Sequence, residues 1–350
     1  MKNLFIMGNP GSGKTAVALG IAQKLRQEGY AVGYFKPVGN ARGIPGYQDE
    51  DAVLMQKVMN MEAPLERITP FRAGPSYLTG YKQMDNALEN IKSAYEEISR
   101  DCDVVITDGS FYPYIAASCG LDSLSLAKEF DAQALVVIKI EDDFSLDQAV
   151  FYNRYLENEG VPILGNIFSN VSRPLLAKAE GIFQPILAKM GFKSVGIIPS
   201  RAEISSPTVA EYYDILGGEV LAGGDHMNHM VEDVVIGAMN SESAFTYLRR
   251  TANKAVIIGG DRADLALAAL ETNTSVLILT GGLYPDVKVI ARASEKKVPV
   301  ILVHTDTYKT IERLDQVSRH IHHTDRMAIS IALENVEEYC DWETIKESLR

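Results

Sequence analysis

The sequence reads Gly8-Asn9-Pro10-Gly11-Ser12-Gly13-Lys14-Thr15 close to its first residue, and this octet fits the Walker A pattern at every defined position. The apolar run Leu4–Met7 precedes it, and a helical pattern over Ala16–Gln27 follows it. A Gly-rich loop between a strand and a helix turns several backbone N–H groups toward phosphates, and the helix dipole favours the same anions. The octet therefore predicts a P-loop that binds a nucleoside triphosphate.

Individual residues of the octet have separate expected roles. Lys14 should contact the β- and γ-phosphates, and the hydroxyl of Thr15 should ligate magnesium. The residues expected to surround the phosphates with their backbone are Gly8, Asn9, Gly11, Ser12 and Gly13. We therefore expect ATP and Mg²⁺ as ligands of this chain.

Magnesium also takes one or two carboxylates in sites of this kind. Asp108 is the first candidate, because it ends the apolar run Val104–Thr107, where a Walker B aspartate lies. Asp51 is the second candidate and Asp49 a weaker alternative to it. Both fall in Gly43–Asp51, which we expect to be a loop, and acidic loop residues are commonly only solvated.

The overall composition argues against several classes of protein. A length of 350 residues predicts two domains, and 46% hydrophobic with 23% charged residues is ordinary for a globular protein. The formal net charge of −12 argues against nucleic acid and against an anionic membrane surface as partners. No apolar run approaches the roughly 20 residues that span a bilayer, and the run near the start is too short for a signal peptide. Three scattered cysteines without zinc-ligand spacing indicate a reducing compartment, so we expect the cytoplasm.

The first two hundred residues alternate apolar runs with helical patterns. The runs are continuous, as is typical of strands buried on both faces of a parallel sheet. They cover Leu4–Met7, Val32–Phe35, Val104–Thr107, Ala134–Ile138, Ile163–Phe168 and Val195–Ile198. The helical patterns cover Ala16–Gln27, Asn86–Ser99, Leu146–Glu157 and Leu175–Lys189, and a further loop is expected at Thr69–Gly80. This order predicts an α/β fold, a parallel sheet with helices on both faces.

A second, smaller alternation follows the Gly-dense segment Ile215–Gly224. Its expected strands are Val234–Ile236, Ala255–Ile258, Val276–Thr280 and Val300–Val303. Its expected helices are Ser243–Arg250, Ala263–Leu270, Asp286–Glu295 and Tyr308–Val317. We therefore predict two α/β domains, at 1–214 and 215–350, the second with a C-terminal helical tail after Arg326.

The first part resembles dethiobiotin synthetase and the wider group of ATP-dependent cobyrinic acid diamide synthases. The shared motifs, after the P-loop, are Lys36-Pro37-Val38, Asp51-Ala52 and Asp108-Gly109, and the resemblance covers roughly residues 1–200. In that family the Lys helps to bind phosphate and the reacting carboxylate, two acids hold magnesium, and a later Asn contacts adenine. The resemblance implies these roles for Lys36, Asp51, Asp108 and Asn170.

One segment departs from that family. The bulky Ser110–Pro113 follows Asp108-Gly109, where dethiobiotin synthetases have a further Gly-rich segment for their substrate. The departure argues against dethiobiotin synthesis, although it leaves the magnesium–ATP site intact.

The second part carries the signature residues of a DRTGG domain, Asp261-Arg262-Ala263-Asp264 and Thr280-Gly281-Gly282. With their flanking segments they resemble the regulatory region of long bacterial phosphotransacetylases. Those enzymes carry a dethiobiotin-synthetase-like module, a DRTGG domain and then an acetyl-transferring domain. Because the given sequence stops after the second module, we expect no acetyl transfer by this chain alone.

The DRTGG residues leave several interpretations open. The glycines after two strand ends can form a small-ligand crevice or merely tight turns. Asp261 and Arg262 can pair with each other, bind a ligand or cross a dimer interface, which the resemblance favours. We therefore expect a homo-oligomer. The histidines of His320-x-His322-His323 and His226-x-x-His229 are interpreted as exposed or interface residues, since neither group has a recognised zinc-ligand spacing.

Two hypotheses about function follow. The shared module order favours a regulator that senses Mg-ATP and is linked to acetyl-phosphate or acetyl-CoA metabolism, with an enzyme of acetate metabolism as a partner. The intact Lys14, Thr15, Lys36, Asp51 and Asp108 favour instead an ATP-dependent ligase that phosphorylates a carboxylate near Lys36. A scaffold with a vestigial ATP site is a third alternative, so whether the chain is an enzyme stays open at this point.

Overall fold

The computed structural model describes residues 2–40, 48–74, 76–79, 86–239, 241–314, 317 and 319–349. The chain forms two compact units: Met1–Ser200 with His320–Arg350, and Arg201–Arg319. This division differs from the expected boundary near residue 215, because the second unit already begins at Arg201. It differs again at the C-terminal end, where the helical tail packs into the first unit and not into the second.

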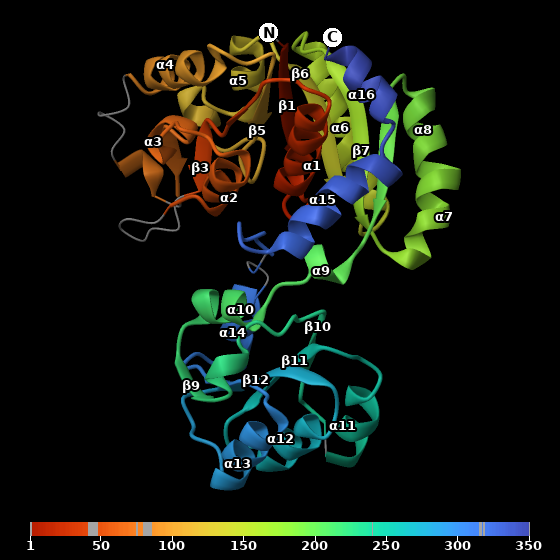
Figure 1. The fold of residues 1–350 in the computed structure, drawn as a ribbon. Helices are drawn as coiled ribbons and strands as arrows, with labels where there is room; N and C mark the ends of the chain where they lie inside the picture. The colour runs from red at the N-terminus through yellow and green to blue at the C-terminus, as the bar shows by residue number, and fades with distance from the viewer. Residues whose placement is uncertain are drawn as a thin grey trace. The chain divides into compact units, whose positions relative to one another are not determined.

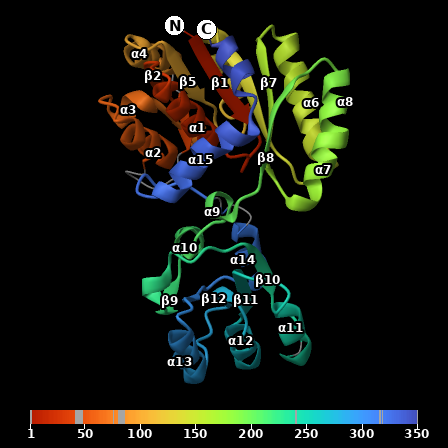
Figure 2. The ribbon, with the colours of Figure 1, turned by 45° about the vertical axis from the view of Figure 1, so that its right-hand side comes forward.

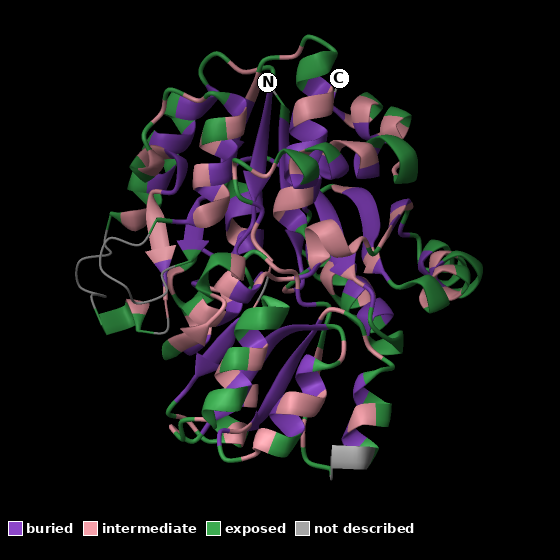
Figure 3. Ribbon diagram, turned by 60° about the horizontal axis from the view of Figure 1, so that its bottom comes forward, coloured by how far each residue is buried: buried purple, intermediate pink, exposed green. Residues whose placement is uncertain are grey.

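A six-stranded sheet lies at the centre of the first unit (Figure 1). In spatial order its strands are β2 (Val32–Phe35), β5 (Val104–Asp108), β1 (Lys2–Gly8), β6 (Gln133–Lys139), β7 (Ile163–Val171) and β8 (Ser194–Pro199). Every neighbouring pair is parallel. The strand interiors are buried on both faces, which Figure 3 shows as purple strands, and the predicted parallel sheet is thereby confirmed.

Helices cover both faces of this sheet (Figures 1 and 2). The connection through α1 (Lys14–Gln27) runs from β1 toward β2, and that through α6 (Asp143–Asn158) runs from β6 to β7, in the opposite direction. Because such crossovers are right-handed, the two helices lie on opposite faces. Further helices of this unit are α4 (Ala87–Ser99), α5 (Ser123–Glu129), α7 (Leu176–Lys178), α8 (Gln184–Lys189), α15 (Arg326–Tyr339) and α16 (Trp342–Ser348). The predicted helix at 175–189 is divided between α7 and α8 by the π-helical segment Ala179–Phe183.

Helix α15 joins the first unit by packing closely on α1. A Cβ at Gly20 of α1 would lie 2.3 Å from the carbonyl oxygen of Ala332 in α15, so only glycine allows this approach. Lys24 of α1 and Glu337 of α15 form an ion pair at 2.6 Å farther along the same contact. The buried face of α15 therefore explains why the tail belongs to the P-loop unit.

The segment between β2 and α4 contains two short strands that the sequence did not predict. These are β3 (Val38–Asn40) and β4 (Phe71–Ala73), which pair in parallel, with α2 (Glu50–Met59) and α3 (Leu65–Ile68) between them. The expected loop Thr69–Gly80 thus includes β4. Of the expected loop Gly43–Asp51, residues 43–47 lie outside the described residues and Asp51 lies in the first turn of α2.

The second unit is built on a five-stranded sheet. In spatial order its strands are β10 (Asp233–Ile236), β11 (Lys254–Gly259), β12 (Thr274–Thr280), β13 (Val300–Leu302) and β9 (Glu219–Ala222). Only β9 is antiparallel to its neighbour, and it was not predicted because glycines flank it on both sides. The helices are α9 (Ala202–Ser205), α10 (Val209–Leu216), α11 (Ser241–Leu248), α12 (Ala263–Leu270), α13 (Val287–Lys296) and α14 (Thr307–Leu314). Two apolar clusters complete the core, one formed with α11 to α13 and the other with α10 and α14.

Within the described part of the chain, no helix has the length and apolar character needed to cross a membrane.

Candidate functional site

The P-loop connects β1 to α1 by a tight turn of the backbone. Gly11 and Gly13 have φ angles of 67° and 70°, in the left-handed region that glycine adopts without strain. Gly8 lies so close to β6 that a Cβ there would come within 1.7 Å of the carbonyl oxygen of Val137. Within the described chain no side chain caps the start of α1, so its first N–H groups suit an anionic ligand such as phosphate.

Lys14 is buried at the first position of α1. Its Nζ donates to the carbonyl oxygen of Asn9 at 3.2 Å. Burial lowers the pKa of Lys14 to about 8, although the negative charge of Asp108 opposes the shift. A buried ammonium whose charge is incompletely compensated gains from an added anion. Lys14 is thus placed where a phosphate group would complete its environment.

Asp108 ends β5, beside Ile6 of β1. Its Oδ2 accepts hydrogen bonds from the Thr15 hydroxyl and from the Tyr34 hydroxyl, both at 2.9 Å. Its Oδ1 is buried and has no hydrogen-bond partner among the described residues. Burial raises the pKa of Asp108, and the positive charge of Lys36 only partly offsets this. A buried carboxylate oxygen without a partner is the feature expected of a cation ligand.

Lys36 follows β2 and lies between two carboxylates. Its Nζ is 3.1 Å from Asp49 Oδ1 and also forms an ion pair with Asp51 Oδ2. Burial would lower the pKa of Lys36, but the attraction of Asp49, Asp51 and Asp108 outweighs it and the pKa is raised. Asp49 additionally caps α2 by accepting from the N–H of Ala52 at 3.1 Å. Asp49, the weaker metal candidate, is therefore a helix cap and a Lys36 partner.

The outer part of the P-loop is held by β6 and β7. Asn9 Oδ1 accepts the backbone N–H of Lys139 at 2.8 Å, and Ser169 Oγ donates to the carbonyl oxygen of Ser12 at 2.7 Å. Asn170 follows Ser169 with a φ of 51°, and its Oδ1 is buried without a partner among the described residues. The fold therefore brings Asn170 beside the P-loop, while its role toward adenine stays a prediction.

The oxygen atoms at this edge of the sheet suit Mg²⁺. Thr15 and Asp108 are in direct contact, and Asp51 lies within Coulombic range of Asp108. Among the described residues no three His, Cys, Asp or Glu side chains form a metal cluster, so a cation here would also need phosphate oxygens. The predicted ligands Thr15, Asp51 and Asp108 thus lie together in the site. Of the three, Asp51 already forms an ion pair with Lys36.

Two residues of the site were not predicted from the sequence. Tyr34 lies in a buried strand, where a tyrosine looks like an ordinary core residue. His320 was interpreted as an exposed or interface histidine, but its Nδ1 lies 3.2 Å from Glu50 Oε2 and 3.9 Å from Asp51 Oδ1. Only the fold reveals this contact, because the chain between Asp51 and His320 includes the entire second unit.

The DRTGG residues occupy two turns at the same edge of the second sheet. A Cβ at Gly260, after β11, would lie 1.8 Å from the carbonyl oxygen of Leu283, after β12, so the two turns pack against each other. Arg262 pairs with Asp264 at 3.0 Å, which corrects the expected alternative of a pair with Asp261. Thr280 Oγ1 lies 2.9 Å from Thr307 Oγ1.

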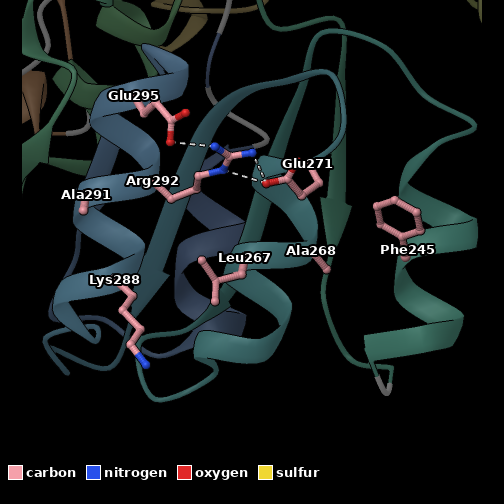
Figure 4. A pocket seen from close by; sticks show the side chains of 8 residues that line it. All are labelled: Phe245, Leu267, Ala268, Glu271, Lys288, Ala291, Arg292 and Glu295. Atoms are coloured by element: carbon pink, nitrogen blue, oxygen red, sulfur yellow. Dashed lines mark hydrogen bonds and ion pairs between the residues drawn. The ribbon is translucent and has the colours of Figure 1, made fainter.

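A groove of about 960 Å³ lies elsewhere in the second unit, between α11, α12 and α13 (Figure 4). Apolar side chains such as Phe245 and Leu267 line it. The guanidinium of Arg292 in this groove already binds Glu271 and Glu295, each at 2.6 Å. The groove thus does not match the donor pattern of a phosphate site, and the P-loop remains the candidate site.

Comparison with known proteins identifies the two modules of the chain. Residues 2–208 match the AAA domain family, and residues 211–317 match the DRTGG domain family. The phosphate acetyltransferase of Pseudomonas putida is 26% identical over 347 residues, which cover 95% of this chain and 49% of that protein. That of Nitratidesulfovibrio vulgaris is 25% identical over 366 residues, which cover 97% of this chain and 50% of that protein. The chain thus spans about half the length of the curated relatives it matches.

A solved structure with a similar part is that of the CBS and DRTGG domains of Clostridium perfringens pyrophosphatase with diadenosine tetraphosphate. The two proteins are 18% identical, and the aligned region covers 43% of this chain and 76% of that chain. The TM-score of 0.29 is too low to bear on function. The AAA domain match, in contrast, spans more than half of this chain. We conclude that the protein belongs to the AAA domain family and joins this P-loop module to a DRTGG domain.

Proposed function

We propose that the protein binds Mg-ATP in its P-loop unit and acts as a nucleotide-sensing regulator linked to acetyl-phosphate or acetyl-CoA metabolism. The observation that carries the proposal is the contact of Thr15 with Asp108 beside buried Lys14. Asp108 Oδ1 has no partner among the described residues, so a cation can be bound without breaking an existing hydrogen bond. Lys14, Thr15 and Asp108 thus form a prearranged site for a cation and a phosphate.

Magnesium would neutralise the phosphate charge and orient the phosphate oxygens. Thr15 and Asp108 would hold it, and Asp51 would complete the acidic side of the site. Lys14 would contact the terminal phosphates, while the N–H groups at the start of α1 would bind the remaining oxygens. Asn170 would contact the adenine base.

The environment of Lys36 favours a sensor over a ligase. A ligase of the dethiobiotin type needs this lysine to bind the reacting carboxylate of its substrate. Here two carboxylates of the chain itself, Asp49 and Asp51, already neutralise Lys36. A substrate carboxylate would have to compete with them for Lys36, whose buried ammonium already has its charge compensated and so gains little from a further anion.

The proposed metabolic link and assembly rest on the relatives. The curated relatives are phosphate acetyltransferases, and this chain matches about half of their length. We therefore propose an enzyme of acetate metabolism as a partner and a homodimer formed through the DRTGG domain. Three free thiols, of Cys102, Cys119 and Cys340, agree with a cytoplasmic location.

The proposal is tested by titrating purified protein with ATP in the presence of Mg²⁺, by calorimetry. Lys14→Ala should weaken ATP binding at least about tenfold, since it removes a charge-assisted contact to phosphate. Lys24→Ala is the matched control. It removes a lysine from the same helix that pairs with Glu337 on the surface, and it should bind ATP like wild type.

Phosphate release is then measured with a panel of small carboxylic acids. We expect no stimulation by any acid. Acid-stimulated release that disappears in Lys14→Ala would establish the ligase instead. The metabolic link has its own readout: extracts of a strain that lacks this chain should have altered phosphate acetyltransferase activity, and unchanged activity would contradict the link.

A further inference from the structure

Two consecutive residues attach the end of the second unit to different parts of the chain. The guanidinium of Arg319 lies 3.5 Å from Glu211 Oε2, within the second unit. Both side chains are largely buried, at 10% and 17% exposed. The next residue, His320, lies against Glu50 and Asp51 of the first unit.

Glu211 lies in the first turn of α10, near the start of the second unit, and hydrogen bonds hold its side chain. It belongs to the capping box of α10, where its carboxylate accepts the N–H of Thr208 at 2.6 Å and the Thr208 hydroxyl donates to it at 3.0 Å. Arg319 thus ties the last residue of the second unit to its first long helix. A rearrangement of the second unit that moves α10 would therefore act on the backbone next to His320.

His320 also lies beside Asp51, a residue of the candidate nucleotide site. Lys36 binds Asp51 at Oδ2, and the imidazole Nδ1 of His320 faces Oδ1 of the same carboxylate. Asp51 therefore has one oxygen directed to each of two partners. Glu50, the neighbour of Asp51 in the first turn of α2, makes the shorter contact with the same imidazole, at 3.2 Å from Nδ1.

The same returning segment also contacts the helix that follows the P-loop. After His320 the chain forms α15, which packs on α1 with the backbone of Ala332 against Gly20. Helix α1 begins with Lys14 and Thr15. The segment after the second unit thus borders the nucleotide site at Asp51 and supports the helix that carries the P-loop residues.

We propose that His320 is a positioning residue for the magnesium side of the nucleotide site. It orients the Asp51 carboxylate, and its place directly after Arg319 makes Mg-ATP binding depend on the state of the second unit. This inference rests on the proposed function, because it requires that the chain bind Mg-ATP.

The test measures ATP affinity as a function of Mg²⁺ concentration, and in EDTA, for wild type and two His320 variants. His320→Ala should raise the half-saturating Mg²⁺ concentration about three- to tenfold, while ATP affinity in EDTA stays the same. His320→Asn should restore most of the loss, because the asparagine amide N–H occupies nearly the position of imidazole Nδ1. A merely structural role would instead lower ATP affinity in EDTA as well.

The matched control is His322→Ala, which removes an imidazole two residues away whose Nδ1 lies 2.7 Å from Thr324 Oγ1. It should have the Mg²⁺ dependence of wild type. Arg319→Ala should shift the Mg²⁺ dependence in the same direction as His320→Ala, and the double variant should not exceed the larger single effect, since the two residues act in series.

The two failures are distinguishable. Wild type without Mg²⁺-dependent ATP binding would overturn the proposed function and this inference with it. Wild type with such binding, but an unchanged Mg²⁺ dependence in His320→Ala, would overturn this inference alone. Fully additive effects of Arg319→Ala and His320→Ala would show that Arg319 does not act through His320, and would contradict the dependence of Mg-ATP binding on the second unit.

Discussion

At the scale of single residues, Tyr34 shows how the core of the sheet supports the site. Its fully buried hydroxyl donates to Asp108 Oδ2, the oxygen that also accepts from Thr15. Burial raises the pKa of Tyr34 well above its ordinary value, and the charge of Asp108 adds to the shift, so the phenol stays a donor at physiological pH. The Walker A pattern and a strand end sufficed to predict that Lys14, Thr15 and Asp108 lie close together. Tyr34 could not be predicted in this way, because only the pairing of β2 with β5 brings it to Asp108.

Tyr34→Phe should lower the free energy of unfolding by about 1–2 kcal/mol, because Asp108 loses a hydrogen bond inside the core. Tyr95→Phe is the matched control. The hydroxyl of Tyr95 is buried without a hydrogen-bond partner among the described residues, so its removal should be neutral or slightly stabilising. Urea unfolding of both variants measures the difference, and equal effects would show that the Tyr34–Asp108 bond adds no stability.

At the scale of elements, the contact of α1 with α15 explains why the helix after Arg326 belongs to the first unit and not, as the sequence predicted, to the second. The helical pattern after Arg326 was read correctly as a helix. Its partner could not be inferred, because local periodicity reports which face is apolar and not what covers that face. Strands were easier to predict than helix partners, because continuous apolar runs identify buried parallel strands directly. Strand β9, which has glycines on both sides, gives no such signal.

Gly20→Ala should destabilise the first unit by about 1–3 kcal/mol, because the new Cβ would press on the backbone of Ala332. Gly181→Ala provides the contrast. A Cβ there meets no atom within 4 Å, so alanine should stabilise the helical segment by up to about 1 kcal/mol. Thermal unfolding compares the two, and a Gly20→Ala protein as stable as wild type would contradict the close packing of α15 on α1.

At the scale of the whole molecule, the first unit is discontinuous in sequence. Its last residues return after the second unit, and Cys340, just after α15, forms an isolated β-bridge with Gly196 of β8. The two sheets and the two modules were predictable, since each repeats strand and helix signals in order. The return of the chain to the first unit could not be predicted, because the loop and helix signals near residue 320 would be the same if the tail packed on the second unit.

The reactivity of Cys340 tests whether the chain returns to the first unit as described. Burial raises the pKa of its thiol to about 12, so little of the reactive thiolate exists at pH 8. In the native protein iodoacetamide should therefore modify Cys119 well before Cys340, and unfolding in urea should abolish the protection of Cys340. Mass spectrometry of the labelled peptides follows both rates. Equal native rates would mean that the half-buried thiol of Cys340 is not shielded by its contact with β8.

The discontinuity also sets the order in which the protein can be made. Lys24 and Glu337 meet across the α1–α15 contact but lie 313 residues apart in the chain. At about 5–20 residues per second, a ribosome needs roughly 15–60 s to bring the second partner out after the first. The DRTGG unit is complete before α15 emerges, so during synthesis it can fold while the surface of α1 around Gly20 is still bare. A nascent chain in that interval offers an apolar helix face to chaperones, and the nucleotide site acquires His320 only after the second unit has been synthesised.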